Sequence, residues 1–181
     1  GDGDGDGGGG LGPLSGFVRF AGDGSQVDKD RQEKAHAHQC VHHSKETRKV
    51  ELYVPDLGHD LVRTLSLQSN GNLIEDEGRA LRCPPGSGPR HLVFHPDIPC
   101  CYNIHELSST VSTLRVNASH DHTTLTAIQT VSTLPSSFAD KSECADVHLS
   151  TNGKFLYGSN RGHDSICIFR IHPQDGMLEV V

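Results

Sequence analysis

Tryptophan is absent from this 181-residue chain, and aromatic residues make up only 5% of it. Proteins that bind single-stranded nucleic acid need aromatic side chains on which bases stack, and duplex-binding proteins need clustered lysine and arginine. This chain has no basic cluster, and its formal net charge is -7. The composition therefore excludes nucleic acid as an expected partner.

Long apolar runs are also missing. No stretch approaches the roughly 18 apolar residues of a membrane span, and the first residues lack the basic-then-apolar pattern of a signal peptide. We therefore expect no membrane partner and a cytoplasmic location. The six cysteines include no CxxC pair, and the adjacent Cys100 and Cys101 would point to opposite faces of a strand. This pattern favours buried, reduced thiols over a disulfide framework or a metal site.

Several catalytic and cofactor motifs are absent as well. The chain has no GxSxG elbow and no glycine-rich stretch in the strand-then-helix context of a nucleotide site. His105 and Glu106 resemble the start of the HExxH zinc motif, but position 109 is serine and the segment is predicted to be a strand. The sequence predicts neither a metal nor a cofactor.

The most informative stretch that is present covers residues 86–107. It begins with Gly-Ser-Gly-Pro, which predicts a loop because these residues continue neither a helix nor a strand ladder. Two short β-type runs follow, 91–95 and 100–104, and a Pro-Asp-Ile-Pro breaker separates them. Runs so close together pair as an antiparallel hairpin. We therefore expect Arg90, His91 and Glu106 to converge on one edge of a sheet.

Similar units lie on both sides of this stretch. Residues 56–61 match 106–111 at an offset of 50, and 106–111 match 161–166 at an offset of 55. Residues 94–97 match 149–152 at the same offset of 55, and Leu73, Leu125 and Leu178 mark the next strand of each unit. Four short antiparallel strands repeated about every 40 to 55 residues are typical of β-propeller blades. Chance similarity among the hairpins of a β-sandwich is the alternative.

The predicted fold class is therefore all-β, a partial β-propeller over residues 11–181 with about three four-stranded blades. The blade units are roughly 33–80, 86–134 and 143–181. Three blades cannot close a ring of roughly four to eight, so we expect an incomplete ring. Residues 1–10, which are only glycine and aspartate, are predicted to be flexible because they bury no apolar area.

Before the first unit, residues 27–40 are rich in charge and lack the apolar face of a helix. We interpret them as a long loop that brings four polar side chains to a surface: Arg31, Gln32, His36 and His38.

Taken together, residues 22–181 resemble the lactonase family of seven-bladed propellers, which includes propeller-type 6-phosphogluconolactonases and fungal carboxy-muconate cyclases. The motifs that carry the resemblance are RQ at 31–32, HAH at 36–38, DLG at 56–58, GSGPRH at 86–91, EL at 106–107 and KFLYGSNRGHDSI at 154–166. The resemblance implies about two further blades before residue 11 and two after residue 181. Pro55 departs from the small residue usual before DLG, and His105 departs from the usual asparagine before Glu-Leu.

The resemblance also implies catalytic residues, namely one histidine of the HAH motif together with Arg90, Glu106 and Arg161. Of the two histidines we favour His38. The converging edge adds three candidates for substrate binding: His36, Asp56 and His91. Arginines can bind a carboxylate or phosphate through two hydrogen bonds and can stabilise negative charge as an ester carbonyl is attacked. Glu106 or a histidine can activate water or move a proton.

We therefore expect a small anionic lactone as partner and hydrolysis of a sugar lactone of the 6-phosphogluconolactone type. A muconate cycloisomerase that uses the same arginines is a second hypothesis. A non-catalytic propeller that binds protein is a third, and it would favour aromatic and apolar anchors on the exposed face. Nothing in the sequence predicts the oligomeric state.

Overall fold

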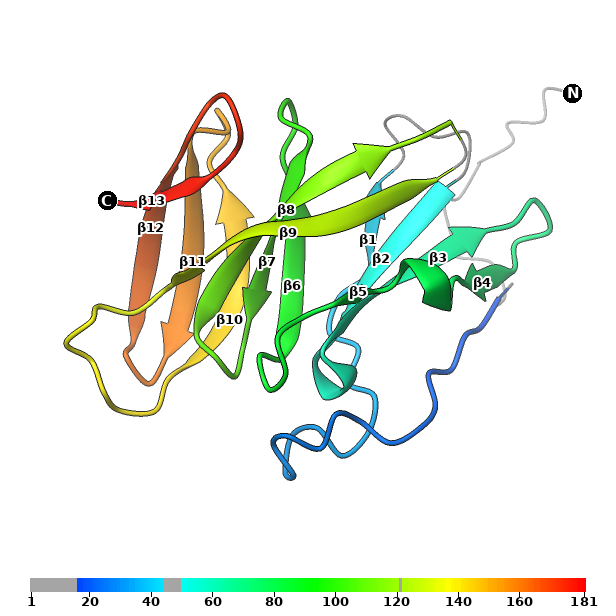
Figure 1. Ribbon diagram of the computed structural model, residues 1–181, viewed down its shortest axis with the longest axis horizontal. Helices are drawn as coiled ribbons and strands as arrows, with labels where there is room; N and C mark the ends of the chain where they lie inside the picture. Colours follow the sequence, from blue (N-terminus) through cyan, green and yellow to red (C-terminus); the bar gives the residue numbers. More distant parts are fainter. Residues whose placement is uncertain (1–15, 44–49, 121) are drawn as a thin grey trace, which may run out of the picture.

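Three antiparallel sheets lie side by side along the molecule (Figure 1). The computed structural model describes residues 16–43, 50–120 and 122–181. No α-helix occurs among these residues, which confirms the predicted all-β class. The segment 1–10, predicted to be flexible, lies outside the described residues.

Each sheet is a meander in which four strands follow chain order, and the first sheet has a fifth short strand. The first contains β1 (Val41–His43), β2 (Val50–Asp56), β3 (Leu61–Leu67), β4 (Leu73–Glu75) and β5 (Leu81–Arg82). The second contains β6 (Pro89–Phe94), β7 (Cys100–His105), β8 (Thr110–Ala118) and β9 (Thr123–Ser132). The third contains β10 (Glu143–Leu149), β11 (Phe155–Arg161), β12 (Ser165–Ile171) and β13 (Leu178–Val180). The first sheet has one strand more than predicted, because the short β5 pairs with the start of β3.

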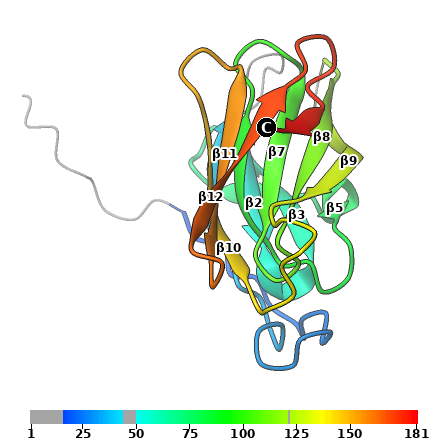
Figure 2. The ribbon, with the colours of Figure 1, turned by 90° about the vertical axis from the view of Figure 1, so that its left-hand side faces the viewer.

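The sheets pack face to face, as Figure 2 shows, and an apolar cluster fills each of the two interfaces. Strand β7 supplies both clusters because its side chains alternate between its two faces. Cys100 and Ile104 pack toward the third sheet, and Cys101 packs toward Tyr53 of the first. The two adjacent cysteines thus point to opposite faces, as predicted, and all six cysteines are free.

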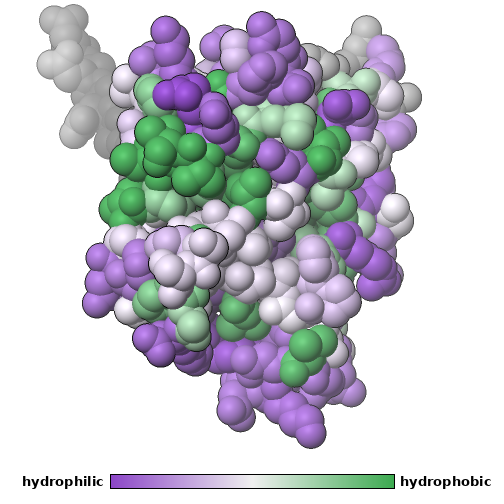
Figure 3. All heavy atoms as spheres, turned by 60° about the vertical axis from the view of Figure 1, so that its left-hand side comes forward, coloured by the Kyte–Doolittle hydropathy of each residue, from purple (hydrophilic) through white to green (hydrophobic). Residues whose placement is uncertain are grey.

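Apolar side chains are also exposed on the outer face of the third sheet. Ile166 and Ile168 of β12 lie there, and Figure 3 shows apolar side chains gathered on this side of the molecule. The inner face of β12 is buried, and Phe169 on this face belongs to the apolar cluster between the second and third sheets. This apolar surface therefore lies on a sheet face and is separate from the charged residues at the end of the sheets.

The central hairpin of each sheet ends in a four-residue loop. The last strand pairs before these loops are Asp56↔Leu61, His105↔Thr110 and Asn160↔Ser165. The last loop residues, Asp60, Ser109 and Asp164, all have a positive φ, of 53°, 50° and 52°. The three loops are therefore structurally equivalent, residue by residue.

This equivalence corrects the predicted repeat. The first loop residues are Leu57, Glu106 and Arg161, so the offset between the first two units is 49 and the predicted 50 was wrong by one residue. The offset of 55 between the second and third units is confirmed. Because neighbouring residues of a strand point to opposite faces, the shift by one places Asp56 at the buried position of His105.

The first strand of each sheet carries an irregularity at the same place. In β6 the register shifts between Pro89 and His91, which leaves Arg90 as the extra residue. In β10 the shift falls between Cys144 and Val147. In the first sheet the bridge Ala37↔Asp56 is likewise offset by one residue from the pair Val41↔Tyr53. Bulges redirect side chains, so these three positions present side chains that a regular strand would turn elsewhere.

The segment before β1 forms a loop, as predicted, and the β2–β3 hairpin holds it. The carboxylate of Asp56 accepts hydrogen bonds from the backbone N–H groups of His36 and Gly58, at 2.8 and 3.1 Å. Gln32 was expected at a surface, but it is fully buried and its side chain donates to the carbonyl of Leu57 at 2.8 Å. The loop is thus fastened by buried polar contacts before it reaches the second sheet.

Gly58 is the position where this fastening is most sensitive. A Cβ atom added there would overlap the carbonyl oxygen of Lys34, so we expect Gly58→Ala to lower the free energy of unfolding by about 1–3 kcal/mol. Urea unfolding measures this loss. In the control Gly78→Ala, the added Cβ would meet only the Asp76 carboxylate, at 3.4 Å. Equal losses in the two variants would contradict this account of the loop.

Candidate active site

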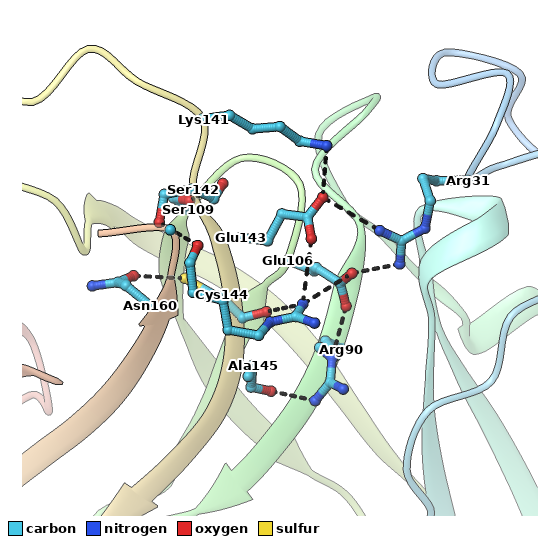
Figure 4. A network of polar contacts seen from close by, with 12 residues as sticks. Arg31, Arg90, Glu106, Ser109, Lys141, Ser142, Glu143, Cys144, Ala145 and Asn160 are labelled. Atoms are coloured by element: carbon cyan, nitrogen blue, oxygen red, sulfur yellow. Dashed lines mark hydrogen bonds and ion pairs between the residues drawn. The ribbon is translucent and has the colours of Figure 1, made fainter. Parts of the chain in front are cut away.

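A buried carboxylate surrounded by arginines lies at one end of the sheets. Glu106 follows β7 directly and is 1% exposed. Its carboxylate contacts Arg31, Arg90 at 2.7 Å and Arg161 at 3.1 Å. Figure 4 shows Glu106 between Arg31 and Arg90. The predicted convergence of Arg90 and Glu106 is therefore present, and the loop before β1 adds Arg31 while the third sheet adds Arg161.

The arginines set the protonation state of Glu106. Burial alone would raise the pKa of this carboxyl group, but the hydrogen bond from Arg31, the charges of Arg31 and Arg161, and the hydrogen bond from Arg90 outweigh it and lower the pKa. Glu106 is consequently ionised at neutral pH and is a weak base. Its position suits a counter-ion that holds the guanidinium groups in place.

A second carboxylate lies at the outer side of this cluster. Glu143, at the start of β10, contacts Lys141 at 3.0 Å, Arg31 at 3.5 Å and Arg161 at 3.7 Å. The cluster therefore contains four cationic side chains and two carboxylates, a formal charge of +2. Lys141 and Arg161 are the most exposed of the four, at 85% and 50%. The exposed side of the cluster is suited to an anion.

The bulges of the second and third sheets meet at Arg90. Its Nε donates to Glu106, and its Nη1 donates to the carbonyl of Ala145 at 2.5 Å and to Nε2 of His91 at 3.2 Å. His91 in turn lies with Nδ1 2.6 Å from a carboxylate oxygen of Asp146. The guanidinium of Arg90 is thus fixed from three sides, and one of its partners, Ala145, lies in the bulge of β10.

The structure separates the two histidines of the HAH motif. The strand pairs of the first hairpin in each sheet show which residues of β1 and β6 are equivalent. By this comparison, His38 occupies in the first sheet the position that Arg90 occupies in the second. Burial, followed by the positive charge of Arg90, lowers the pKa of His38, so its imidazole is neutral at neutral pH. His36 instead lies with its ring 3.1 Å from Glu33. Of the two, His38 is the one within electrostatic reach of the arginine cluster.

Asp56 does not join this site, although it was predicted to bind substrate. It is 0% exposed, and its carboxylate contacts Arg63 at 2.7 Å and His59 at 3.0 Å, besides the backbone of the loop. All its acceptor positions face the protein. The shifted register explains this difference, because Leu57 rather than Asp56 corresponds to Glu106.

Some residues of the cluster were absent from the predicted site. Arg31 was expected to reach a surface, yet no sequence signal connected it to Glu106. Asp146 stands 55 residues after His91, so the repeat offset contained a signal for it. Lys141 and Glu143 had no such signal: Lys141 lies in the connection between the second and third sheets, and Glu143 is the first residue of β10.

Among the described residues, no group of three or more metal-ligating side chains is arranged to hold a metal ion. The same part of the chain contains no helix long and apolar enough to cross a membrane.

Comparison with known proteins assigns this arrangement to a family. The profile described as "Lactonase, 7-bladed beta-propeller" matches residues 5–181. The chain belongs to this lactonase family. The 6-phosphogluconolactonase of Bacillus subtilis (strain 168) is 35% identical over 170 residues, which are 94% of this chain and 46% of that protein.

Two further relatives agree. The 6-phosphogluconolactonase of Formosa agariphila is 35% identical over 174 residues, 91% of this chain and 45% of that protein. The solved structure of the periplasmic gluconolactonase PpgL of Pseudomonas aeruginosa superposes with a TM-score of 0.78 at 31% identity, covering 89% of this chain and 44% of that one. This member of the lactonase family thus spans about half the length of the relatives that it matches.

Proposed function

We propose that the protein hydrolyses a sugar lactone of the 6-phosphogluconolactone type, as the names of its relatives suggest. The observation that carries the proposal is the cluster around Glu106, where four cationic side chains outnumber two carboxylates at the end of three sheets. A phosphorylated lactone presents both an anion and an ester carbonyl to such a site. The substrate in this proposal is a small, anionic lactone.

The roles of the residues follow from their charges. Neutral His38 accepts a proton from water as the water oxygen attacks the lactone carbonyl carbon. Arg90 stabilises the negative charge that develops on the carbonyl oxygen. The ring C–O bond then breaks, and the leaving oxygen takes up the proton, which yields the open hydroxy acid. Glu106 remains ionised and keeps Arg90 and Arg161 in place.

The exposed cations suit the phosphate group. Arg161 can form two hydrogen bonds with it, and Lys141 adds a point charge. Both side chains contact Glu143, at 3.7 and 3.0 Å. An incoming phosphate therefore competes with one carboxylate that is itself only partly buried.

We expect Arg161→Ala to lower kcat/KM for a phosphorylated sugar lactone by about 100-fold or more, because a charge-assisted contact in a partly dry site is lost. Lactone hydrolysis by the intact protein measures it. Arg170→Ala is the matched control, since Arg170 is an exposed arginine of the same sheet that pairs with Glu179 at 3.2 Å. Unchanged turnover in Arg161→Ala would remove this residue from the site.

The same assay decides between the two enzymatic hypotheses. A cycloisomerase would act on carboxymuconate and leave the phosphorylated lactone untouched. The arginine cluster suits either substrate, because both carry anionic groups that a guanidinium binds. Turnover of carboxymuconate alone would therefore replace lactone hydrolysis as the function, with the site unchanged.

We propose a cytoplasmic location for the protein. Its six cysteines are all free, and three of them are buried inside the interfaces between sheets. Reduced thiols are typical of proteins from reducing compartments. Thiol labelling of the protein from cells, unfolded without a reductant, should modify all six, and protection of any pair would contradict this location.

A further inference from the structure

A series of polar contacts runs from the third sheet to the arginine cluster. Asp146 contacts His91 at 2.6 Å, His91 contacts Arg90 at 3.2 Å, and Arg90 contacts Glu106 at 2.7 Å. Only the last two of these four residues belong to the predicted catalytic set. Asp146 is 46% exposed and contributes to neither apolar cluster. Its contact with His91 is therefore not required to fill the core.

The chemistry of arginine determines how His91 is protonated. A guanidinium only donates hydrogen bonds, so the bond from Arg90 exists only while Nε2 of His91 carries no proton and accepts it. The proton of the neutral ring then lies on Nδ1, which donates it to the carboxylate of Asp146. The two partners thus select the same tautomer from opposite sides of the ring.

Asp146 is equipped to remain an acceptor. Burial alone would raise its pKa, but hydrogen bonds from His91, His148 and the backbone of Val147 lower it to about 2. Its own N–H donates to Ser159 at 3.0 Å, which fixes the bulged backbone of β10. The carboxylate is therefore charged and fixed over the whole neutral pH range.

The equivalent position in the first sheet has a different role. Residue Gln39 corresponds to His91, and its side chain accepts a hydrogen bond from the backbone N–H of Leu92 in the next sheet, at 2.6 Å. That contact joins two sheets through the backbone. Between the second and third sheets, the equivalent contact joins two titratable side chains, His91 and Asp146, and His91 also contacts Arg90.

We propose that Asp146 is a positioning residue, which holds His91 in its Nδ1–H tautomer so that Nε2 keeps the guanidinium of Arg90 turned toward the lactone carbonyl. This role deepens the proposed lactone hydrolysis and rests on it. His91, expected from the sequence to bind substrate, acts here through Arg90. The pair orients the group that stabilises the oxyanion and undergoes no net proton transfer itself.

The test is Asp146→Asn in the intact protein, labelled with ¹⁵N-histidine. The neutral amide can either accept from or donate to Nδ1, so His91 should populate both tautomers in the ring-nitrogen spectrum, whereas the unmodified protein shows the Nδ1–H form alone. We also expect kcat for a phosphorylated lactone to fall about tenfold at nearly unchanged KM, because orientation is lost and the phosphate contacts are kept.

Asp175→Asn is the matched control, because Asp175 forms a similar pair with His172 at 3.0 Å on the exposed surface. It should change neither kcat nor the His91 spectrum. A single Nδ1–H tautomer in Asp146→Asn, or mixed tautomers with full kcat, would overturn the proposal. If the unmodified protein hydrolyses no lactone, the proposed function fails, but the role of Asp146 in holding His91 is still tested by the spectra. That role is supported if the unmodified protein shows the Nδ1–H form and Asp146→Asn loses it. An Nε2–H form of His91 in the unmodified protein overturns it.

Discussion

Glu106→Gln is expected to lower the free energy of unfolding by about 2–3 kcal/mol at pH 7, because it leaves the guanidinium groups around a buried position without their shared counter-ion. Removal of one partner from a fully buried ion pair costs about 3–5 kcal/mol. The smaller value follows from solvent screening, since Arg31 and Arg161 are 35% and 50% exposed.

The pH dependence makes this prediction specific. The pKa of Glu106 is lowered in the folded protein, so its stabilising contribution is complete above the ordinary value of about 4.3. It is lost as the pH falls through the lower, folded pKa. The difference between the unmodified protein and Glu106→Gln should therefore shrink between pH 5 and pH 3, as urea unfolding will measure.

Glu143→Gln is the control for this substitution. Glu143 contacts two of the same arginines, but it is more exposed, and its loss should cost less than about 1 kcal/mol. We also expect Glu106→Gln to lower kcat/KM by about 100-fold, because Arg90 and Arg161 lose their orientation. A stability difference that stays constant with pH would contradict the role of Glu106 as an ionised counter-ion.

The second large effect concerns His105, which stands where the family usually has asparagine. His105 is 1% exposed, and burial lowers its pKa to about 4 against a smaller opposing effect of Asp60. Its Nε2 lies 2.9 Å from the hydroxyl of Ser112. Between pH 6.5 and 4 the unfolded chain therefore binds a proton that the folded chain does not, and stability falls with falling pH.

The size of the effect follows from the two pKa values. From pH 7 to pH 5, protonation of His105 in the unfolded state should cost the protein about 2 kcal/mol. His105→Asn removes this dependence, so the variant should lose less stability than the unmodified protein over the same range. Urea unfolding at pH 7, 6 and 5 measures the slopes. The control His172→Asn changes an exposed histidine, and equal slopes in all three proteins would contradict the prediction.

The hairpins, the three sheets and the family could all be predicted from the sequence. These features depend on local chemistry: glycine and proline break the chain, and short β-rich runs between such breakers pair with their neighbours. The segment 86–107 illustrates this, because the predicted pairing of its two runs brings Arg90 to Glu106. The charged residues 27–40 lack an apolar face, which correctly predicted that they do not form a helix.

The register of the repeat and the full composition of the site were decided by tertiary structure. Sequence matching aligned Asp56 with Glu106, but loop geometry aligns Leu57 with it, and one residue is the difference between a structural carboxylate and a position in the site. Arg31 contacts Glu106 and Glu143 only because the loop before β1 lies against the other two sheets. Such contacts depend on how the sheets pack, and a linear pattern does not encode the distances between residues that lie 75 and 112 positions apart.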